Sequence, residues 1–342
     1  MARVLVTGAG GYIGSVLVQS LLERGYAVRA IDRFFFGIDV LPRCEQIEVV
    51  KEDTRRLLPD HLRGIDAVVD LAALSNDPSG ELFQRATWAI NCDARVRCAR
   101  IAKETGVKRY ILPSSCSIYG FQDDGVVVNE ESPTHPLTTY AKANEKAEMG
   151  VLQLADDHFT VVVLRQATVF GYSPRMRFDL AINGMTYGAW KNGILPLMRD
   201  GTQWRPMLHV KDAAAAICFM LEASPSLVNG QRFNIGADEN NYQLRKLADI
   251  VAEILPKPVR VEWYGDPDHR SYRVSFHKLS SLGFRTRYGA RDGVLEVFEA
   301  LESGKLERNA KTITLDWYKE LVKWHSIIKD VEMYGGILDL CE

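Results

Sequence analysis

The sequence has little of what marks membrane, secreted or nucleic-acid-binding proteins. Its longest apolar runs fall far short of the roughly 20 residues that a membrane-spanning helix needs. The net charge is −2, and charged residues are spread along the chain, so no basic stretch indicates nucleic acid or a membrane surface. The start, MARVLVTGAGG, lacks the apolar run of a signal peptide. We therefore expect a cytoplasmic protein with neither a nucleic-acid nor a membrane partner.

Cysteine is scarce as well. The six cysteines are Cys44, Cys92, Cys98, Cys116, Cys218 and Cys341, and no two of them form a CxxC pair. Such a scattered set is typical of reduced thiols. We therefore predict neither a disulfide framework nor a metal site. The composition, 46% hydrophobic and 25% charged, is that of a globular protein.

Short apolar runs alternate with helical patterns through the first half of the chain. The runs that read as strands are 3–7, 27–32, 47–51, 65–73, 107–115 and 159–165. Helical spacing is clearest at 11–25, 81–105 and 138–156. Near-continuous apolar strands that alternate with helices predict an α/β fold, a doubly wound parallel sheet of the Rossmann type.

The rhythm changes after residue 171. Beyond it, helices are expected at 209–224 and 241–255, strands at 232–236 and 259–264, and mostly helix over the last 50 residues. We predict a Rossmann domain at 1–171, to which part of 205–236 returns. A smaller mixed α/β C-terminal lobe then comprises 172–204 and 237–342. Within it, 184–204 reads as a loop.

A glycine motif opens the chain. TGAGGYIG (7–14) places Gly8, Gly11 and Gly14 between a strand and a helix, where the backbone can approach a pyrophosphate at a helix N-terminus. Asp32 follows at the end of the second strand, where a carboxylate binds the adenosine ribose and repels a 2′-phosphate. This pattern predicts NAD.

Two neighbouring residues leave alternatives open. Arg33, next to Asp32, could hold a 2′-phosphate, so NADP is not excluded. Asp53, in KEDT after the third strand, could accept a hydrogen bond from the adenine amino group or simply cap a helix.

Five motifs in order resemble one family. They are TGAGGYIG (7–14), DLAAL (70–74), SSCSIYG (114–120), TYAKAN (139–144) and RPMLHVKD (205–212). The set is similar to the extended short-chain dehydrogenase/reductase family, the nucleotide-sugar epimerases and dehydratases. The resemblance implies a nucleoside-diphosphate sugar substrate and a homodimer formed through two helices per subunit, near 81–105 and 138–156.

The resemblance also implies a set of cofactor contacts. They are Gly8, Gly11, Tyr12, Ile13, Gly14, Asp32, Arg33, Asp53, Thr54, Leu71, Ala72, Ala73 and Tyr140.

The same resemblance assigns catalytic roles. Tyr140 matches the base that removes a proton from a sugar hydroxyl, and Ser115 matches the hydroxyl that hydrogen-bonds the same oxygen. Dehydratases of the family carry an acid pair where this chain has Cys116 and Ser117, two residues that the resemblance places among the substrate contacts. The absence of that acid pair argues against a sugar 4,6-dehydratase. The simpler interpretation of Cys116 is a buried neutral thiol.

Cations are expected around the diphosphate. Arg205 and Arg270 match the family's phosphate arginines, with Arg273 a rival to Arg270, because arginine offers bidentate donors. Asn183 matches an amide contact to the phosphates. The predicted loop 184–204 would bind the base.

One position departs from the family pattern. A lysine is usual four residues after the tyrosine, where it holds the nicotinamide ribose and lowers the tyrosine pKa, but this chain has Asn144. Lys142 and Lys146 lie on other sides of the helix, because i+2 and i+6 stand about 200° and 240° from i. Lowering a tyrosine pKa from about 10 to about 7 needs roughly 4 kcal/mol. The sequence does not show what supplies it, although Asn144 can still hydrogen-bond a ribose.

We read the chain as an NAD-dependent nucleotide-sugar epimerase with a variant YxxxN site, most simply acting at C4 through a keto-sugar. One alternative is a nucleotide-sugar 4-ketoreductase that consumes NAD(P)H. Another is a non-redox or decayed NAD-binding protein.

Overall fold

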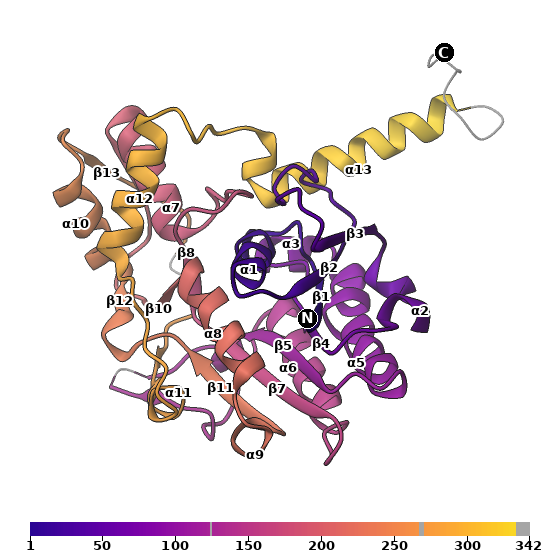
Figure 1. Cartoon of the computed structure of the whole chain (residues 1–342). Coiled ribbons are helices and arrows are strands. Elements are labelled where there is room, and N and C mark those ends of the chain that lie inside the picture. Colours follow the sequence, from indigo (N-terminus) through magenta and orange to yellow (C-terminus); the bar gives the residue numbers. More distant parts are fainter. Residues whose placement is uncertain (124, 267–269, 333–342) are drawn as a thin grey trace.

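Seven parallel strands form the central sheet of the computed structural model, which describes residues 1–123, 125–266 and 270–332 (Figure 1). They are β1 (Arg3–Thr7), β2 (Ala27–Asp32), β3 (Ile47–Lys51), β4 (Ala67–Asp70), β5 (Arg109–Ser115), β7 (Thr160–Gln166) and β11 (Gln231–Ile235). Their order is β11-β7-β5-β4-β1-β2-β3. The order reverses between β1 and β4, as in a doubly wound dinucleotide-binding sheet. The predicted fold class is confirmed.

Helices cover both faces of this sheet (Figure 1). They are α1 (Tyr12–Glu23) and α8 (Val210–Glu222) on one face, and α2 (Pro59–Leu62), α5 (Arg95–Glu104) and α6 (Thr139–Leu152) on the other. Alternate strand residues enter the two cores: Val4 and Val6 pack with α1, and Leu5 packs on the opposite side. Burial on both faces explains why these strands read as continuous apolar runs.

The single helix predicted over 81–105 is wrong. The chain forms α3 (Asp77–Leu82), α4 (Gln84–Trp88), a π-helical segment η2 (Ala89–Ala94) and then α5. Phe83 breaks the first helix with φ −119° and ψ 48°. The η2 segment aims Asn91 at the loop after β4, where its amide exchanges hydrogen bonds of 2.9 and 3.0 Å with the backbone of Leu74. A distant backbone segment thus accounts for an interruption that helical periodicity does not reveal.

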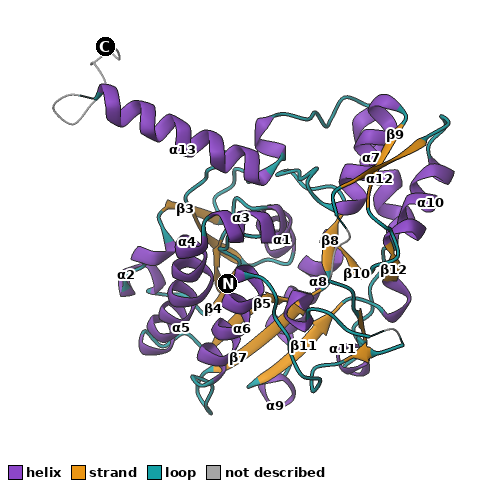
Figure 2. Ribbon diagram, turned by 180° about the vertical axis from the view of Figure 1, so that it is seen from behind, coloured by secondary structure: helices purple, strands orange, loops and turns teal. Residues whose placement is uncertain are grey.

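Smaller sheets and the remaining helices build the second lobe and the connections to it (Figure 2). The strands are β6 (Val127–Val128), β8 (Thr168–Phe170), β9 (Ile194–Met198), β10 (Trp204–His209), β12 (Asn241–Gln243), β13 (Arg260–Tyr264) and β14 (Arg273–Val274). The helices are α7 (Ala181–Asn192), α9 (Pro225–Val228), α10 (Leu244–Ile254), α11 (His277–Ser281), α12 (Ala290–Glu302) and α13 (Thr314–Val331).

The reading of 184–204 as a loop is also wrong, because α7 and β9 occupy most of it. Two glycines of α7 serve close packing. A Cβ at Gly184 would lie 2.7 Å from the Phe178 carbonyl oxygen, and one at Gly188 would lie 2.6 Å from the Ile194 carbonyl oxygen. A helix that presses against backbone needs small residues on that side, so glycine here marks contact.

A buried ion pair fixes α6 against the sheet. Glu148 of α6 accepts hydrogen bonds from Arg165 of β7 at 2.9 and 3.1 Å and from the Ser114 hydroxyl of β5 at 2.5 Å. The two charged side chains are 1% and 6% exposed, so each neutralises a charge that would otherwise be costly to bury. The pair sets the position of α6 relative to the end of β5, and these two elements carry Tyr140 and Ser115.

The last described helix, α13, runs out from the body of the molecule in both views (Figures 1 and 2). Only its first turns are anchored: Trp317 donates a hydrogen bond of 2.7 Å to the Phe35 carbonyl oxygen, and the Tyr318 ring contacts Phe35 and Phe36. Across residues 1–123, 125–266 and 270–332, every helix is too short or too polar to cross a bilayer.

Candidate functional site

A cavity of about 480 Å³ opens at the carboxyl ends of the central strands, where the strand order reverses. This is the place where doubly wound sheets bind ligands. Most of the residues predicted from the sequence line it. They are Gly8, Gly11, Tyr12, Ile13, Gly14, Asp32, Arg33, Asp53, Thr54, Leu71, Ala72, Ala73, Ser115, Ser117, Tyr140, Arg205 and Arg270. The structure therefore brings segments from both lobes to one pocket.

The glycine loop leaves no room for side chains. Gly8 has φ +66°, and a Cβ there would lie 2.7 Å from the Ala72 backbone nitrogen. A Cβ at Gly14 would collide with the carbonyl oxygens of Gly8 and Ala9. The loop after β1 thus packs on the loop after β4 and on the start of α1, and the N-terminus of α1 stays open to the pocket. This arrangement fits the pyrophosphate of a dinucleotide.

Asp32 lies at the end of β2 beside that loop. Its carboxylate accepts hydrogen bonds from the Gly10 backbone at 3.0 Å and the Phe34 backbone at 2.7 Å. Burial raises the pKa of Asp32, and these backbone hydrogen bonds oppose the rise. The carboxylate is held in one orientation and lines the pocket, as a ribose acceptor requires.

Asp53 is hydrogen-bonded to two arginines at the rim of the pocket. It caps the 3-10 turn η1 (Thr54–Arg56), and it receives hydrogen bonds from Arg55 at 2.9 and 2.6 Å and from Arg33 at 3.2 Å. The hydrogen bonds from Arg55 hold the pKa of Asp53 at about 2. Because Arg33 is engaged with this carboxylate, it is tied to the rim of the pocket on the Asp53 side.

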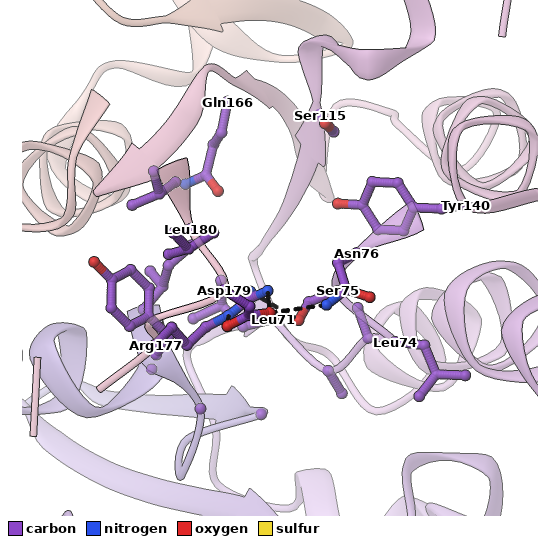
Figure 3. Close-up of a pocket in the computed structure, with 18 of the residues that line it drawn as sticks. Leu71, Leu74, Ser75, Asn76, Ser115, Tyr140, Gln166, Arg177, Asp179 and Leu180 are labelled. Atoms are coloured by element: carbon purple, nitrogen blue, oxygen red, sulfur yellow. Dashed lines mark hydrogen bonds and ion pairs between the residues drawn. The ribbon is translucent and has the colours of Figure 1, made fainter. Parts of the chain in front are cut away.

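Tyr140 and Ser115 meet in the middle of the pocket. Figure 3 shows the Tyr140 hydroxyl pointing into the open space with Ser115 nearby. Burial raises the pKa of Tyr140, whereas the positive charge of Arg95 and a hydrogen bond with Ser115 lower it. The Ser115 hydroxyl also accepts a hydrogen bond of 3.1 Å from the Ser117 backbone. The two hydroxyls can therefore contact one substrate oxygen.

Asn144 lies outside the pocket. The side chain is 1% exposed and does not line the cavity. Its Nδ2 donates to the Tyr140 carbonyl oxygen at 2.9 Å, and its Oδ1 accepts from Nη1 of Arg95 at 2.5 Å. With both ends of the amide engaged, the ribose contact expected from the sequence has no support in this geometry. The structure instead places a guanidinium beside the position of the missing lysine.

Two more predicted substrate residues lie behind the pocket wall. The Cys116 thiol is fully buried and donates to the Arg165 carbonyl oxygen at 3.2 Å, and burial raises its pKa, so it is a neutral thiol. Asn183 is fully buried, accepts from the Gly171 backbone at 2.9 Å and donates to the Arg177 carbonyl oxygen at 2.9 Å. Asn183 therefore links α7 to the backbone of the segment 171–177, which leads into the second lobe.

Two polar atoms on the pocket wall lack partners. Oγ of Ser117 and Nε2 of Gln166 are buried and make no hydrogen bond within the described part of the chain. Buried polar groups are normally satisfied, so orphaned atoms that line a pocket are candidates to contact a ligand. Gln166, at the end of β7, was not predicted from the sequence, because a strand-end glutamine carries no motif.

Arg205 and Arg270 lie beside each other in the pocket wall. Nη1 of Arg205 donates to the carbonyl oxygens of Trp204 and Arg270, and its guanidinium lies 5.4 Å from the Tyr272 ring centre. Arg270 pairs with Asp77 of α3. The rival Arg273 lies over the Trp204 ring and does not line the cavity. Of the two candidates, Arg270 is the one that reaches the pocket.

Three charged residues of the segment after β8 were missed by sequence reasoning. Arg177 donates two hydrogen bonds to Asp179, at 3.0 and 2.6 Å. It also donates to the Ser75 hydroxyl at 3.2 Å, and Asn76 donates to Asp179 at 3.0 Å (Figure 3). This bridge joins the second-lobe segment to the loop after β4 and closes one side of the pocket.

The third, Arg175, has unsatisfied nitrogens. It is 5% exposed, stacks 3.6 Å over the Phe36 ring and donates from Nη2 to Thr314 of α13. Its Nε and Nη1 are buried without a partner in the described residues, although Arg175 lines the pocket. Burial, and then the like charge of Arg177, lowers the pKa of Arg175. An anion in the pocket would relieve this penalty.

Comparison with known proteins identifies the family. Residues 4–236 match the NAD dependent epimerase/dehydratase family, and the chain belongs to it. A Bacillus subtilis relative, described as the uncharacterized UDP-glucose epimerase YtcB, is 28% identical over 74% of this chain and 82% of its own length. The UDP-glucuronate 4-epimerase of Thermodesulfobacterium geofontis is 25% identical over 81% of this chain and 85% of its own length.

A solved structure shares the fold over nearly the whole chain. It is MoeE5 in complex with UDP-glucuronic acid and NAD, with a TM-score of 0.78 and 27% identity, covering 89% of this chain and 100% of MoeE5. The predicted family and NAD cofactor are confirmed. Among the residues present, the glycine loop, Asp32 and the unsatisfied Arg175 fit this cofactor.

We predict that Arg175→Met weakens NAD binding about tenfold or more, because a charged hydrogen bond to a phosphate contributes roughly 1.5–3 kcal/mol. Calorimetric titration with NAD measures the change. Arg291→Met is the matched control, since Arg291 is an exposed arginine of α12. Equal NAD affinity in Arg175→Met and Arg291→Met would show that Arg175 serves only to anchor α13.

Proposed function

We propose that this protein is an NAD-dependent nucleotide-sugar epimerase that acts at C4. The observation that carries the proposal is that one pocket gathers the groups needed for each part of the reaction. It is lined by the glycine loop after β1, by Asp32 at the end of β2, by Ser115 at the end of β5, by Tyr140 of α6, and by Arg205 and Arg270. A sugar held by its diphosphate at the arginines would present its ring to Tyr140. The UDP-glucuronate 4-epimerase relative and the MoeE5 complex with UDP-glucuronic acid favour a UDP-sugar.

In this proposal Tyr140 is the proton-transfer residue. Its phenolate takes the proton from the 4-hydroxyl, and Ser115 holds the same oxygen through a hydrogen bond as the carbonyl forms. NAD, when bound, supplies the chemistry of taking up a hydride from C4 and returning it. Tyr140 then gives its proton back to the oxygen.

Epimerisation also requires that the sugar turn over while its anchor stays in place, because the hydride must return to the opposite face of C4. A clamp on the diphosphate permits this, since it holds the molecule away from the reacting ring. Ser117 Oγ and Gln166 Nε2, both buried without a partner in the described residues, are suited to contact the sugar hydroxyls. Dehydration is not favoured, because the Cys116 thiol is buried behind the wall and kept neutral.

Tyr140→Phe removes only the hydroxyl, so we expect it to abolish turnover and to leave NAD binding and folding intact. Chromatographic separation of the products from a panel of UDP-sugars, with enzyme-bound NAD and no added reductant, measures turnover. Stoichiometric loss of added NAD(P)H in the same assay would instead identify a ketoreductase. A Tyr140→Phe enzyme that retains full activity would place the chemistry elsewhere.

Arg205→Ala should raise the dissociation constant for UDP about tenfold or more, because one charged bidentate contact is lost. NAD affinity should not change, since Arg205 lies on β10, outside the central sheet whose strand ends carry the glycine loop and Asp32. Arg273→Ala is the control, because Arg273 stacks on Trp204 outside the cavity. The assignment of Arg205 fails if both variants bind UDP as the unmodified chain does.

We further propose a homodimer through α3–α6, the region expected from the family resemblance. Leu82, Trp88 and Met149 on these helices are 52%, 38% and 49% exposed, which is typical of an apolar contact surface. Light scattering should give twice the mass of one chain, and Trp88→Glu should give a monomer. Trp324→Glu on α13 is the control; dissociation by this variant alone would move the interface to α13.

A further inference from the structure

Arg95 is a buried cation that has no anionic partner among the described residues. It begins α5, directly after the π-helical segment η2, and is 3% exposed. Its Nε donates to the Ala72 carbonyl oxygen at 3.2 Å, and its Nη1 donates to Oδ1 of Asn144 at 2.5 Å. Both partners are neutral. Among the described residues, no ion pair includes Arg95, and the buried carboxylate of Asp70 accepts hydrogen bonds from Thr7 and Tyr110 instead.

Burying an unpaired guanidinium costs several kcal/mol, so such groups are usually matched by a carboxylate or by a ligand. Asn144 lies one helical turn after Tyr140, and its Nδ2 donates to the Tyr140 carbonyl oxygen at 2.9 Å. After burial, which raises the pKa of Tyr140, the positive charge of Arg95 is the largest influence on that pKa, and it lowers it. The Arg95 guanidinium also holds Ala72, a residue of the pocket wall. Its charge therefore lies directly behind the wall that carries Tyr140.

We propose that Arg95 is a positioning residue. From behind the pocket wall it supplies the positive charge that a lysine at position 144 would supply, and Asn144 holds it in place. This inference rests on the proposed role of Tyr140 as the base. When Tyr140 ionises, the phenolate becomes the negative charge that Arg95 lacks. Phenolate and guanidinium then stabilise each other in a region of low dielectric.

Other charged groups around Tyr140 do not provide the same help. Asp77 of α3 opposes ionisation, although it is paired with Arg270. Arg177, on the loop after β8, favours ionisation, but its charge is matched by Asp179. From β5, the neutral Ser115 contributes a hydrogen bond to Tyr140.

The lysines of α6 itself are poorly placed as well. Lys142 and Lys146 are exposed on other sides of the helix. Arg95 therefore remains as the cation near Tyr140 with no carboxylate of its own in the described chain.

The geometry also explains the asparagine. A lysine ammonium in place of the Asn144 amide would meet Nη1 of Arg95, and two buried like charges repel strongly. Asn144 instead offers an acceptor to Arg95 and a donor to the helix. Asparagine at position 144 and arginine at position 95 thus depend on each other. A lysine at position 144 would be compatible only with an uncharged residue at position 95.

Titration of Tyr140 tests the proposal without turnover. For the unmodified chain and for each variant below, the phenolate absorbance of the NAD-bound protein is measured against pH. The same measurement is made after Tyr140→Phe is added to that protein. The difference between the two curves is the titration of Tyr140. Arg95→Gln should move the ionisation of Tyr140 to higher pH, because it removes the charge but keeps a hydrogen-bonding side chain. Arg95→Lys should restore most of the shift. Arg100→Gln, which removes an exposed charge from the same helix, should leave it unchanged.

Where the chain turns over a sugar nucleotide, the acidic limb of its pH–rate profile should move with the titration. Turnover near neutral pH should then fall about tenfold for each unit of upward shift, since each unit changes the phenolate fraction tenfold. The double variant Arg95→Gln/Asn144→Lys should ionise at the pH of the unmodified chain or below. Asn144→Lys alone should lower the denaturation midpoint more than the double variant does.

The proposal is overturned if Tyr140 ionises at the same pH in Arg95→Gln as in the unmodified chain, or if Arg100→Gln shifts it equally. It is also overturned if Arg95→Lys behaves like Arg95→Gln, because the role would then be a hydrogen bond and not a charge. If the unmodified chain converts no sugar nucleotide, the proposed function fails, yet the titration still decides the role of Arg95.

Discussion

The loop after β4 is the constraint around which the site is built. It is irregular and lies in a pocket wall, so after Leu71, whose N–H donates to the Thr7 carbonyl oxygen at 3.2 Å, several of its backbone groups take side-chain partners. Thr7 accepts from the Ala72 nitrogen, Arg95 donates to the Ala72 oxygen, and Asn91 binds both backbone groups of Leu74. The π-helical interruption of the following helix brings Asn91 and Arg95 to these positions. The loop thereby becomes a fixed wall against which cofactor and substrate can be placed.

Charge is the second organising feature. The chain as a whole is nearly neutral, yet buried arginines surround the pocket, and the ligands of the family are anions. Arg177 is matched by Asp179, whereas Arg95 and Arg175 have no carboxylate partner in the described residues. A protein stores such charges only where something negative arrives. A cofactor pyrophosphate near Arg175 and a phenolate near Arg95 are the two negative groups that the proposed chemistry provides.

The anchoring of the two lobes follows the same logic. Arg177 and Asp179 of the segment after β8 bind Ser75 and Asn76 of the loop after β4. Tyr12 of the glycine loop donates to the Gly171 carbonyl oxygen at 2.5 Å and accepts from Asn183 of the second lobe. Contacts between lobes are therefore made by residues that adjoin the pocket, so ligand binding and lobe position are physically linked.

The sequence by itself determined the features that depend on short stretches of chain. The fold class follows from alternating strands and helices, and the glycine motif with Asp32 predicts the dinucleotide site, because each of these signals is local. Tertiary structure decided what depends on distant partners. Arg95 and Asn144 are 49 residues apart, and no periodicity links them. Helix α7 was not predicted, and the backbone that its glycines contact is not visible in the sequence. The cation beside the proposed base Tyr140 is Arg95, which belongs to another helix. Tertiary packing brings it to the place where the motif of α6 lacks a lysine.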